Sequence, residues 1–416
     1  MAIIKPFEAV RPQPEYAVEV SSLPYDVMNT AEARQMAEGN PKSFLHVSRA
    51  EIDFEEGTDE HSQPVYEKAR DNFYKMMEDG ILFQDAYPFF YIYQQNMNGR
   101  TQTGLVACSS IEDYFNDIIK KHELTRPEKE EDRIRHMETL QAHVGPIFLT
   151  YPQNNSVDKI VNEVCDKEEP VYNILTKDGI HHTVWLLMDN EKTEKIISIF
   201  ENEIPFTYIA DGHHRTASAA KVGLKMKEQN PHHDGTEEYN FFLSVLFPDD
   251  QLQIMDYNRV VKDLNGLSEA NFLSRVEEKF KIEDLRLKIE TAKPKSLHQF
   301  AMYLSSAWYS LEAKEEIIKA DPIGILDITI LQENILAPLL GINDPRTDKR
   351  IDFVGGIRGL QELQRRVDSG EMKVAFALYP VSLKQLMDIA DSGNIMPPKS
   401  TWFEPKLRDG LFSHLF

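Results

Sequence analysis

Short apolar runs alternate with charged stretches of helical period along the whole 416-residue chain. Two pairs of apolar or aromatic runs joined by tight turns predict β-hairpins. One pair is Phe89–Gln95 and Gly104–Cys108 around Asn98-Gly99, and the other is His298–Leu304 and Trp308–Ala313 around Ser305-Ser306. Apolar residues at helical spacing predict helices between the strands. The main ones are Asn29–Gly39, Val65–Gly80, Ile111–Ile119, Pro127–His143, Thr216–Glu228, Asn271–Phe280, Ile325–Leu340 and Ser382–Ser392.

This alternation of helices with strands predicts a mixed α+β protein. The length exceeds the roughly 250–300 residues at which a single core stops growing, so more than one packed unit is expected. We place soft boundaries near residues 80 and 265. They give an N-terminal segment, 1–80, that packs on the core, a catalytic core at 81–265 and a C-terminal α/β region at 266–416.

The composition narrows the classes of function. Lys and Arg number 46 and Asp and Glu 68, so the net charge is 46 − 68 = −22, which argues against a nucleic-acid partner. Hydrophobic residues make up 41% of the chain, enough for a folded core. Cys108 and Cys165 form no disulfide or zinc motif. No apolar run has the length of a membrane span or a signal peptide, so we expect a cytoplasmic protein without a membrane partner. The oligomeric state stays open.

The strongest candidate site is the turn Asp211-Gly212-His213-His214-Arg215. It lies between a buried-type strand, Phe206–Ala210, and the helix predicted from Thr216. A helix start offers unpaired N–H groups and a positive dipole end, Gly212 permits close approach, and Arg215 adds a bidentate donor, which together suit phosphate. Asp211 would hold Mg²⁺ or accept a proton. The structural alternative makes Asp211 an ordinary N-cap and His213 a packing residue.

A second candidate is Glu123, which follows His122 and precedes a cationic cluster that includes Arg133. A carboxylate in such surroundings can act as a general base toward a hydroxyl. A zincin motif is excluded because HExxH requires His at the position of Arg126. The alternative is a solvated, charged lead-in to the next helix. Asp26 and Lys399 are further candidates for the same cleft, although the tail around Lys399 also suits a structural role.

Two histidine pairs, His181-His182 and His232-His233, lie in polar surroundings. Neighbouring histidines rarely converge on one metal, so we expect both pairs at the surface.

The chain resembles the bacterial family known as domain of unknown function 1015. The resemblance rests on Tyr208–Arg215 (YIADGHHR) with an Ala-rich helix behind it, and on further blocks in the same order. These are Leu23–Val27, Thr103–Ala107, Lys121–Thr125 with Asp132-Arg133, Asn258–Val261, Asp327–Leu340 and the closing PPKSTWFEPK. The turn is also similar to that of ParB/sulfiredoxin-like folds, in particular the free L-serine kinases. This implies a mixed-sheet core that carries a strand–turn–helix phosphate site, with N- and C-terminal α/β additions.

Carried onto this sequence, the resemblance implies a phosphotransferase that acts on free L-serine or a similar hydroxyl amino acid. Glu123, Asp211 and His213 would be catalytic, with Asp211 as the Mg²⁺ ligand. Gly212, His214, Arg215 and His122 would bind the phosphates of ATP, ADP or pyrophosphate. Sulfiredoxin chemistry needs Cys in the phosphate turn, where this chain has His, and the negative charge disfavours a ParB-like role.

Two other classes of function remain open at this stage. The first is a non-catalytic regulatory module that binds a nucleotide at the same turn. The second is a metal-dependent hydrolase in which His213, His214 and Asp211 are the ligands. Binding without turnover would indicate the first, and tightly held Zn²⁺ or Mn²⁺ the second.

Overall fold

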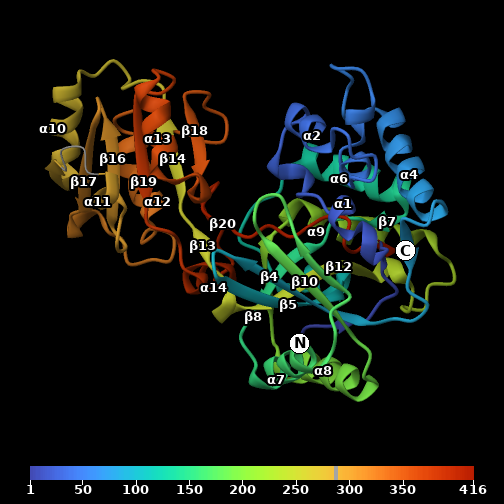
Figure 1. Ribbon diagram of the computed structural model, residues 1–416. Helices are drawn as coiled ribbons and strands as arrows, with labels where there is room; N and C mark the ends of the chain where they lie inside the picture. Colours follow the sequence, from blue (N-terminus) through green and yellow to red (C-terminus); the bar gives the residue numbers. More distant parts are fainter. Residues whose placement is uncertain (285–288) are drawn as a thin grey trace. The chain divides into compact units, whose positions relative to one another are not determined.

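The computed structural model describes residues 1–284 and 289–416 and divides the chain into two compact units (Figure 1). The first unit consists of Met1–Leu252 together with Pro405–Phe416, and the second of Gln253–Glu404. Residues 1–80 therefore belong to the same unit as the central sheet. The boundary expected near residue 265 lies close to the start of the second unit, but the last residues of the chain return to the first.

A nine-stranded mixed sheet forms the centre of the first unit. Its strands run in the order β6-β11-β8-β12-β5-β4-β10-β9, and β1 also pairs with β5. The pairs β6/β11 and β8/β12 are parallel and the others are antiparallel. The strands are β1 (Ile4–Lys5), β4 (Phe90–Met97), β5 (Arg100–Ser110), β6 (Ile119–Lys120), β8 (Ile147–Tyr151), β9 (Tyr172–Leu175), β10 (His181–Leu187), β11 (Thr207–Asp211) and β12 (Phe241–Pro248).

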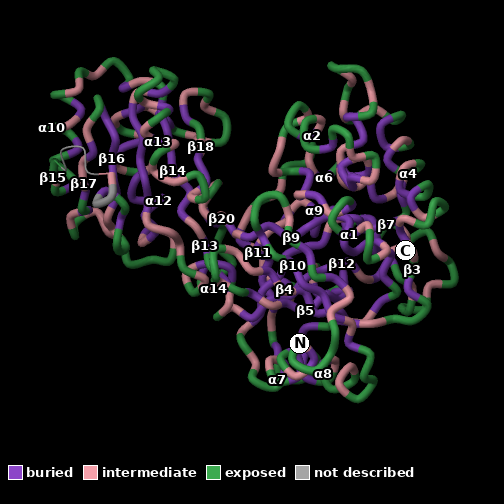
Figure 2. Tube along the Cα trace, in the orientation of Figure 1, coloured by how far each residue is buried: buried purple, intermediate pink, exposed green. Residues whose placement is uncertain are grey.

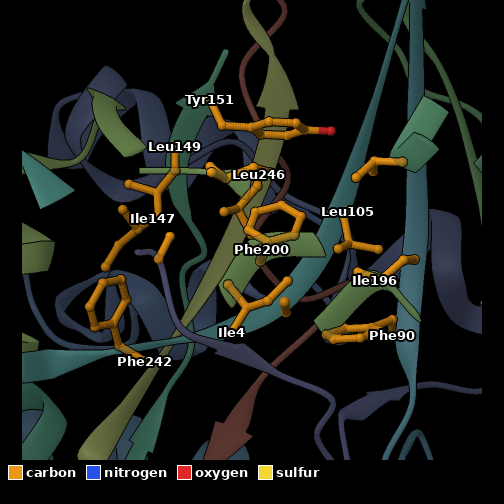
Figure 3. Close-up of a cluster of buried hydrophobic side chains, with 14 of the residues drawn as sticks. Ile4, Phe90, Leu105, Ile147, Leu149, Tyr151, Ile196, Phe200, Phe242 and Leu246 are labelled. Carbon is orange, nitrogen blue, oxygen red and sulfur yellow. The ribbon is translucent and has the colours of Figure 1, made fainter. Parts of the chain in front are cut away.

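Alternation along the strands divides apolar side chains between the two faces of this sheet. Phe90 and Ile92 of β4 join the main hydrophobic cluster, in which Leu105, Leu149 and Phe200 are fully or almost fully buried (Figure 3). Burial of a large side chain such as Phe200 stabilises the fold by roughly 1.5–3 kcal/mol. Helices α7 (Asn155–Lys167) and α8 (Asn190–Glu203) contribute one apolar stripe each to this cluster.

The C-terminal segment packs against the other face of the sheet, where Tyr91 and Tyr93 alternate along β4 with the clustered residues. The ring of Phe412 lies 5.3 Å from that of Tyr91 and 6.0 Å from that of Tyr93. The amide of Gln95 donates to the backbone carbonyl of Lys406 at 2.9 Å. Strand β21 (His414–Leu415) pairs with β7 (Ala142–His143). Residues 405–416 are thus an integral layer of the first unit.

Helices cover the remaining part of this unit. A second apolar cluster joins α4 (Gln63–Glu78) to residues from α3 (Leu45–Ser48) and to Leu140 of α6 (Pro127–Leu140). The other elements here are α1 (Ala17–Val20), α2 (Thr30–Ala37), α5 (Ile111–Phe115), α9 (His213–Gln229), β2 (Val10–Pro12) and β3 (Leu82–Gln84).

The second unit is built on a six-stranded antiparallel sheet in the order β15-β17-β16-β19-β14-β18. Its central strands are buried along their length (Figure 2). The strands are β14 (Tyr257–Val261), β15 (Phe280–Asp284), β16 (Gln299–Leu304), β17 (Ala307–Ala313), β18 (Ile351–Gly355) and β19 (Val374–Leu378). The helices are α10 (Glu269–Lys279), α11 (Ile289–Ala292), α12 (Asp327–Leu331), α13 (Gly359–Asp368) and α14 (Leu383–Asp391), and β13 (Ile254–Met255) pairs with β20 (Trp402–Phe403).

The predicted α+β class, with a mixed sheet that carries a strand–turn–helix, is confirmed. Two of the predicted helices are interrupted or end early. The helix expected over Ile111–Ile119 ends at Phe115, and Asp117 then takes a left-handed conformation before β6. The helix expected over Ile325–Leu340 is α12 followed by a π-helical turn, Gln332–Leu336. Among the described residues, no helix combines the length and apolar character needed to cross a membrane.

Candidate phosphate site

The turn between β11 and α9 has a conformation that requires glycine. Gly212 has φ +97° and ψ 31°, in the left-handed region, and a Cβ there would lie 3.2 Å from Nε of Arg215. The backbone N–H and the hydroxyl of Thr216 both donate to the carbonyl of Gly212. Helix α9 therefore begins at His213, three residues before the predicted start, and its N-cap residue, Gly212, has no side chain with which to cap it. The first N–H groups and the positive dipole end of α9 lie at this turn, an arrangement that suits an anion.

Arg215 lies buried on the first turn of α9, behind this N-terminus. Nη1 donates to the carbonyl of Pro146 at 2.7 Å. Nη2 lies 3.4 Å from Asp211 and 3.9 Å from Asp26. Burial acts to lower the pKa of Arg215, but these carboxylates and Asp409 hold it above its ordinary value. The guanidinium is therefore a fixed positive charge at the turn.

The C-terminal segment brings two further charged groups to the turn. Nζ of Lys406 lies 3.5 Å from the Asp211 carboxylate, and the Lys406 side chain is only 9% exposed. Asp409 is buried against Gly145, and its Oδ1 has no hydrogen-bond partner among the described residues. Burial raises the pKa of Asp409 to about 7, although Arg215 acts in the opposite direction. Neither residue was among the sequence-based candidates.

Glu123 lies beside His213, as the sequence hypothesis requires. Oε2 of Glu123 is 3.9 Å from Nδ1 of His213. The rings of His122 and His213 pack edge to face with centroids 4.4 Å apart. Burial lowers the pKa of His122 to about 4 and that of His213 well below its ordinary value, so both rings are neutral at pH 7.

His214 contacts the segment that carries Glu123. Its Nε2 accepts a hydrogen bond from the backbone N–H of Arg126 at 3.1 Å. Burial, followed by the charge of Arg126, lowers the pKa of His214. Both histidines of the turn therefore contact residues 122–126, His213 as a buried residue and His214 as a half-buried one.

Arg133 also lies near the turn, but its charge is neutralised. It forms an ion pair with Asp132 at 2.7 Å, and its guanidinium lies 3.9 Å above the ring of Tyr25. Burial acts to raise the pKa of Asp132, but Arg133 and hydrogen bonds from Tyr66 and His61 hold it down at about 2. Arg133 thus supports Tyr25 and, through it, the neighbouring Asp26.

Lys399 belongs to the second unit, where its Nζ lies 5.6 Å from the ring centroid of Tyr257. It is not among the residues that the first unit brings to the turn. The expectation that His181-His182 lies at the surface is wrong for His182, which is fully buried. Its ring accepts a hydrogen bond from Arg408 at 3.2 Å and contacts the Tyr93 hydroxyl at 2.7 Å.

The acidic groups at the turn suit Mg²⁺ in the presence of phosphate. Among the described residues, no group of three or more His, Cys, Asp or Glu is arranged to hold a metal by itself. Asp211 and Asp26 both approach the same nitrogen of Arg215. Mg²⁺ in phosphoryl-transfer sites commonly binds one or two carboxylates and takes its other ligands from water and substrate phosphates.

Residues 4–329 match the family described as protein of unknown function (DUF1015). The chain belongs to this family. The match covers the first unit up to Leu252, including the turn and Glu123, and extends into the second unit as far as α12. Residues 405–416, which supply Lys406 and Asp409, lie outside the part of the chain that identifies it as a DUF1015 protein.

Several solved structures are similar at low identity. A free serine kinase in complex with AMP is 13% identical with a TM-score of 0.34, and the alignment covers 69% of this chain and 84% of that one. SbnI with C-terminal truncation from Staphylococcus aureus is 11% identical, with a TM-score of 0.39 and coverage of 73% and 85%. A conserved hypothetical protein from Pyrococcus furiosus is 15% identical, with a TM-score of 0.34 and coverage of 70% and 90%. No curated protein matches the sequence.

Proposed function

We propose that the protein is a phosphotransferase that moves a phosphoryl group from ATP, ADP or pyrophosphate to the hydroxyl of free L-serine or a similar amino acid. The observation that carries this proposal is the N-terminus of α9, which has glycine as its N-cap residue and is flanked by two buried cations, Arg215 and Lys406, with Glu123 beside its first residue. Both substrates are small molecules, and the reaction takes place in the cytoplasm without nucleic acid or membrane.

The donor phosphates would bind at the start of α9. The first N–H groups of the helix donate to phosphate oxygens, and Gly212 leaves room for close approach. Arg215 and Lys406 stabilise the charge that spreads over the phosphoryl oxygens in the transition state. A Mg²⁺ ion bound at Asp211, with Asp26 near it, would neutralise further phosphate charge.

Glu123 is the proposed general base. Its carboxylate takes the proton from the acceptor hydroxyl, and the hydroxyl oxygen forms a bond to phosphorus. The bond from phosphorus to the bridging oxygen of the donor breaks, and the electron pair stays on the leaving phosphate. The acceptor would therefore lie between Glu123 and the phosphates at the turn.

A ³¹P NMR assay with Mg²⁺, L-serine and each donor in turn tests this function. Wild-type protein should give a phosphomonoester signal with at least one donor. Glu123→Gln and Asp211→Asn should each lower its rate by about 10²-fold or more. Glu128→Gln is the matched control, because Glu128 lies near Glu123 in sequence and its side chain is 66% exposed.

Direct binding measurements distinguish the proposed phosphotransferase from a non-catalytic regulatory module. Nucleotide that binds the wild-type protein without transfer to any hydroxyl amino acid would indicate a regulatory module. Failure of ATP, ADP and pyrophosphate to bind would overturn the phosphate site itself.

A further inference from the structure

The segment that carries Glu123 is irregular and lies between β6 and α6. Glu123 can act as a base only if this segment is held at a fixed place relative to the turn. One backbone N–H group on each side of Glu123 donates a hydrogen bond to a histidine of the turn. The N–H of His122 donates to Nε2 of His213 at 3.5 Å, and the N–H of Arg126 donates to Nε2 of His214 at 3.1 Å.

These bonds fix the proton positions on both rings. A neutral imidazole has one N–H, so a ring whose Nε2 accepts a hydrogen bond carries its proton on Nδ1. In His213 this places the Nδ1 proton on the side of Glu123, whose Oε2 is 3.9 Å away. Both rings must stay neutral to accept the bonds. Their burial favours the neutral form.

The same geometry leaves little capacity for phosphate on His213. Phosphate oxygens need hydrogen-bond donors, but Nε2 of His213 serves as an acceptor and its Nδ1 proton lies on the side of Glu123. His213 is also enclosed, because the fully buried His122 ring packs against it.

We propose that His213 and His214 are positioning residues that hold the two ends of the segment 122–126 and thereby place Glu123 opposite the N-terminus of α9. This inference rests on the proposed function, since it assigns the role of two residues in that site. This role accounts for two consecutive histidines at the start of α9. One accepts a hydrogen bond from His122 and the other from Arg126, at the two ends of the segment.

The test uses substitutions that keep or remove the acceptor. The side-chain amide oxygen of Gln reaches a position close to that of Nε2, whereas Asn reaches only as far as Nδ1. His214→Gln should therefore retain the bond from Arg126, and His214→Asn should lose it. His232→Asn is the matched control, because His232 is an exposed histidine of the same unit.

Amide hydrogen exchange gives a readout that does not depend on activity. Protection of the Arg126 amide should fall about fivefold or more in His214→Asn, and stay near wild type in His214→Gln and in the control. Unchanged protection in His214→Asn would overturn the proposal even if the enzyme proves active. The His213 pair of variants should affect the His122 amide in the same way.

Steady-state kinetics with the donor identified by NMR supplies the second readout. Misplacement of Glu123 should lower kcat about 10–100-fold in His214→Asn, leave KM for the donor within about twofold, and be rescued in His214→Gln. A donor KM that rises tenfold with kcat unchanged would show that the ring contacts phosphate, which contradicts the proposal. A wild-type protein without transfer, combined with the expected exchange pattern, would reject the proposed function and retain the positioning role.

Discussion

The ammonium nitrogen of Lys406 lies 3.5 Å from the carboxylate of Asp211, so a residue close to the C-terminus forms part of the turn that begins α9. Together with Arg215, Lys406 gives the proposed phosphate site two buried cations.

Lys406→Met should lower the rate of phosphoryl transfer by about 10²-fold, because one of the two charges that stabilise the transition state is lost while the apolar stem is retained. Lys406→Arg should keep much of the activity. Lys167→Met, at a lysine of the same unit whose side chain is 65% exposed, is the control. The ³¹P assay measures all three, and equal rates for Lys406→Met and wild type would exclude Lys406 from the site.

Gly212→Ala should destabilise the protein and weaken donor binding. Placing Ala at φ +97° costs about 1–2 kcal/mol, and the new Cβ would lie 3.2 Å from Nε of Arg215. Gly99→Ala provides the matched control, because Gly99 has φ +80° and, among the described residues other than its chain neighbours, no heavy atom lies within 4 Å of the added Cβ. Urea unfolding should show a loss in both variants, at least as large in Gly212→Ala because of its contact with Arg215, whereas calorimetric titration with nucleotide should show weaker binding only in Gly212→Ala. Equal affinity in the two variants would contradict the role of this turn.

Asp409 should make stability fall as pH rises toward neutrality. Its pKa in the folded protein is about 7, above the ordinary value of about 3.9, so between these values the folded state binds more protons than the unfolded state. The contribution of the protonated carboxyl is complete below about pH 4 and is lost as pH rises through 7.

Asp409→Asn removes this titration while Arg215, Asp26, Arg133 and Tyr25, the charged and titratable groups around it, remain. Compared with wild type, the Asp409→Asn variant should therefore be relatively more stable at pH 8 than at pH 5, as judged by the difference between their free energies of unfolding. Urea titrations at both pH values measure it, and a difference that is independent of pH would show that Asp409 does not change its protonation between pH 5 and pH 8.

Arg408 should act on stability more than on chemistry. It donates to Nε2 of His182 and to the Thr176 hydroxyl, both at 3.2 Å, and forms an ion pair with Asp178. Arg408→Met removes the charged donor to Nε2 of the buried His182 and leaves Asp178 without its ion-pair partner, so it should cost about 2 kcal/mol or more in the free energy of unfolding. Asp178→Asn should cost less, because the Asp178 side chain is 38% exposed. An effect of Arg408→Met below about 0.5 kcal/mol would show that the segment is held by its other contacts.

Local features of the fold were predictable from sequence. The Asn98-Gly99 and Ser305-Ser306 hairpins follow from two-residue turns between β-type runs, and in both turns the two residues have positive φ. The strand before Gly212 and the helix after it follow from the same kind of short-range pattern. Glu123 could be proposed as a partner of the turn because of the family resemblance, and the structure brings its carboxylate beside His213.

Features that depend on distant segments were not predictable in this way. His182 looks like a surface residue in sequence because its neighbours are polar, and it is buried because Arg408 and Tyr93 supply its partners. The tail drew attention to Lys399 because of its prolines, yet Lys406 is the lysine at Asp211. A sequence pattern describes only neighbouring residues, so it cannot predict which of the two lysines lies beside a residue as distant in sequence as Asp211.

The first unit is discontinuous in sequence, since the chain leaves it after Leu252 and re-enters at Pro405. During synthesis from the N-terminus, the turn, α9 and Glu123 all emerge from the ribosome long before Lys406 and Asp409. While the entire second unit is made, residues 405–416 are absent, and the face of the sheet that carries Tyr91 and Tyr93 lacks the layer that they form. This layer can form only after residues 405–416 have been made, so the proposed active site gains its second cation only once the whole second unit has been synthesised.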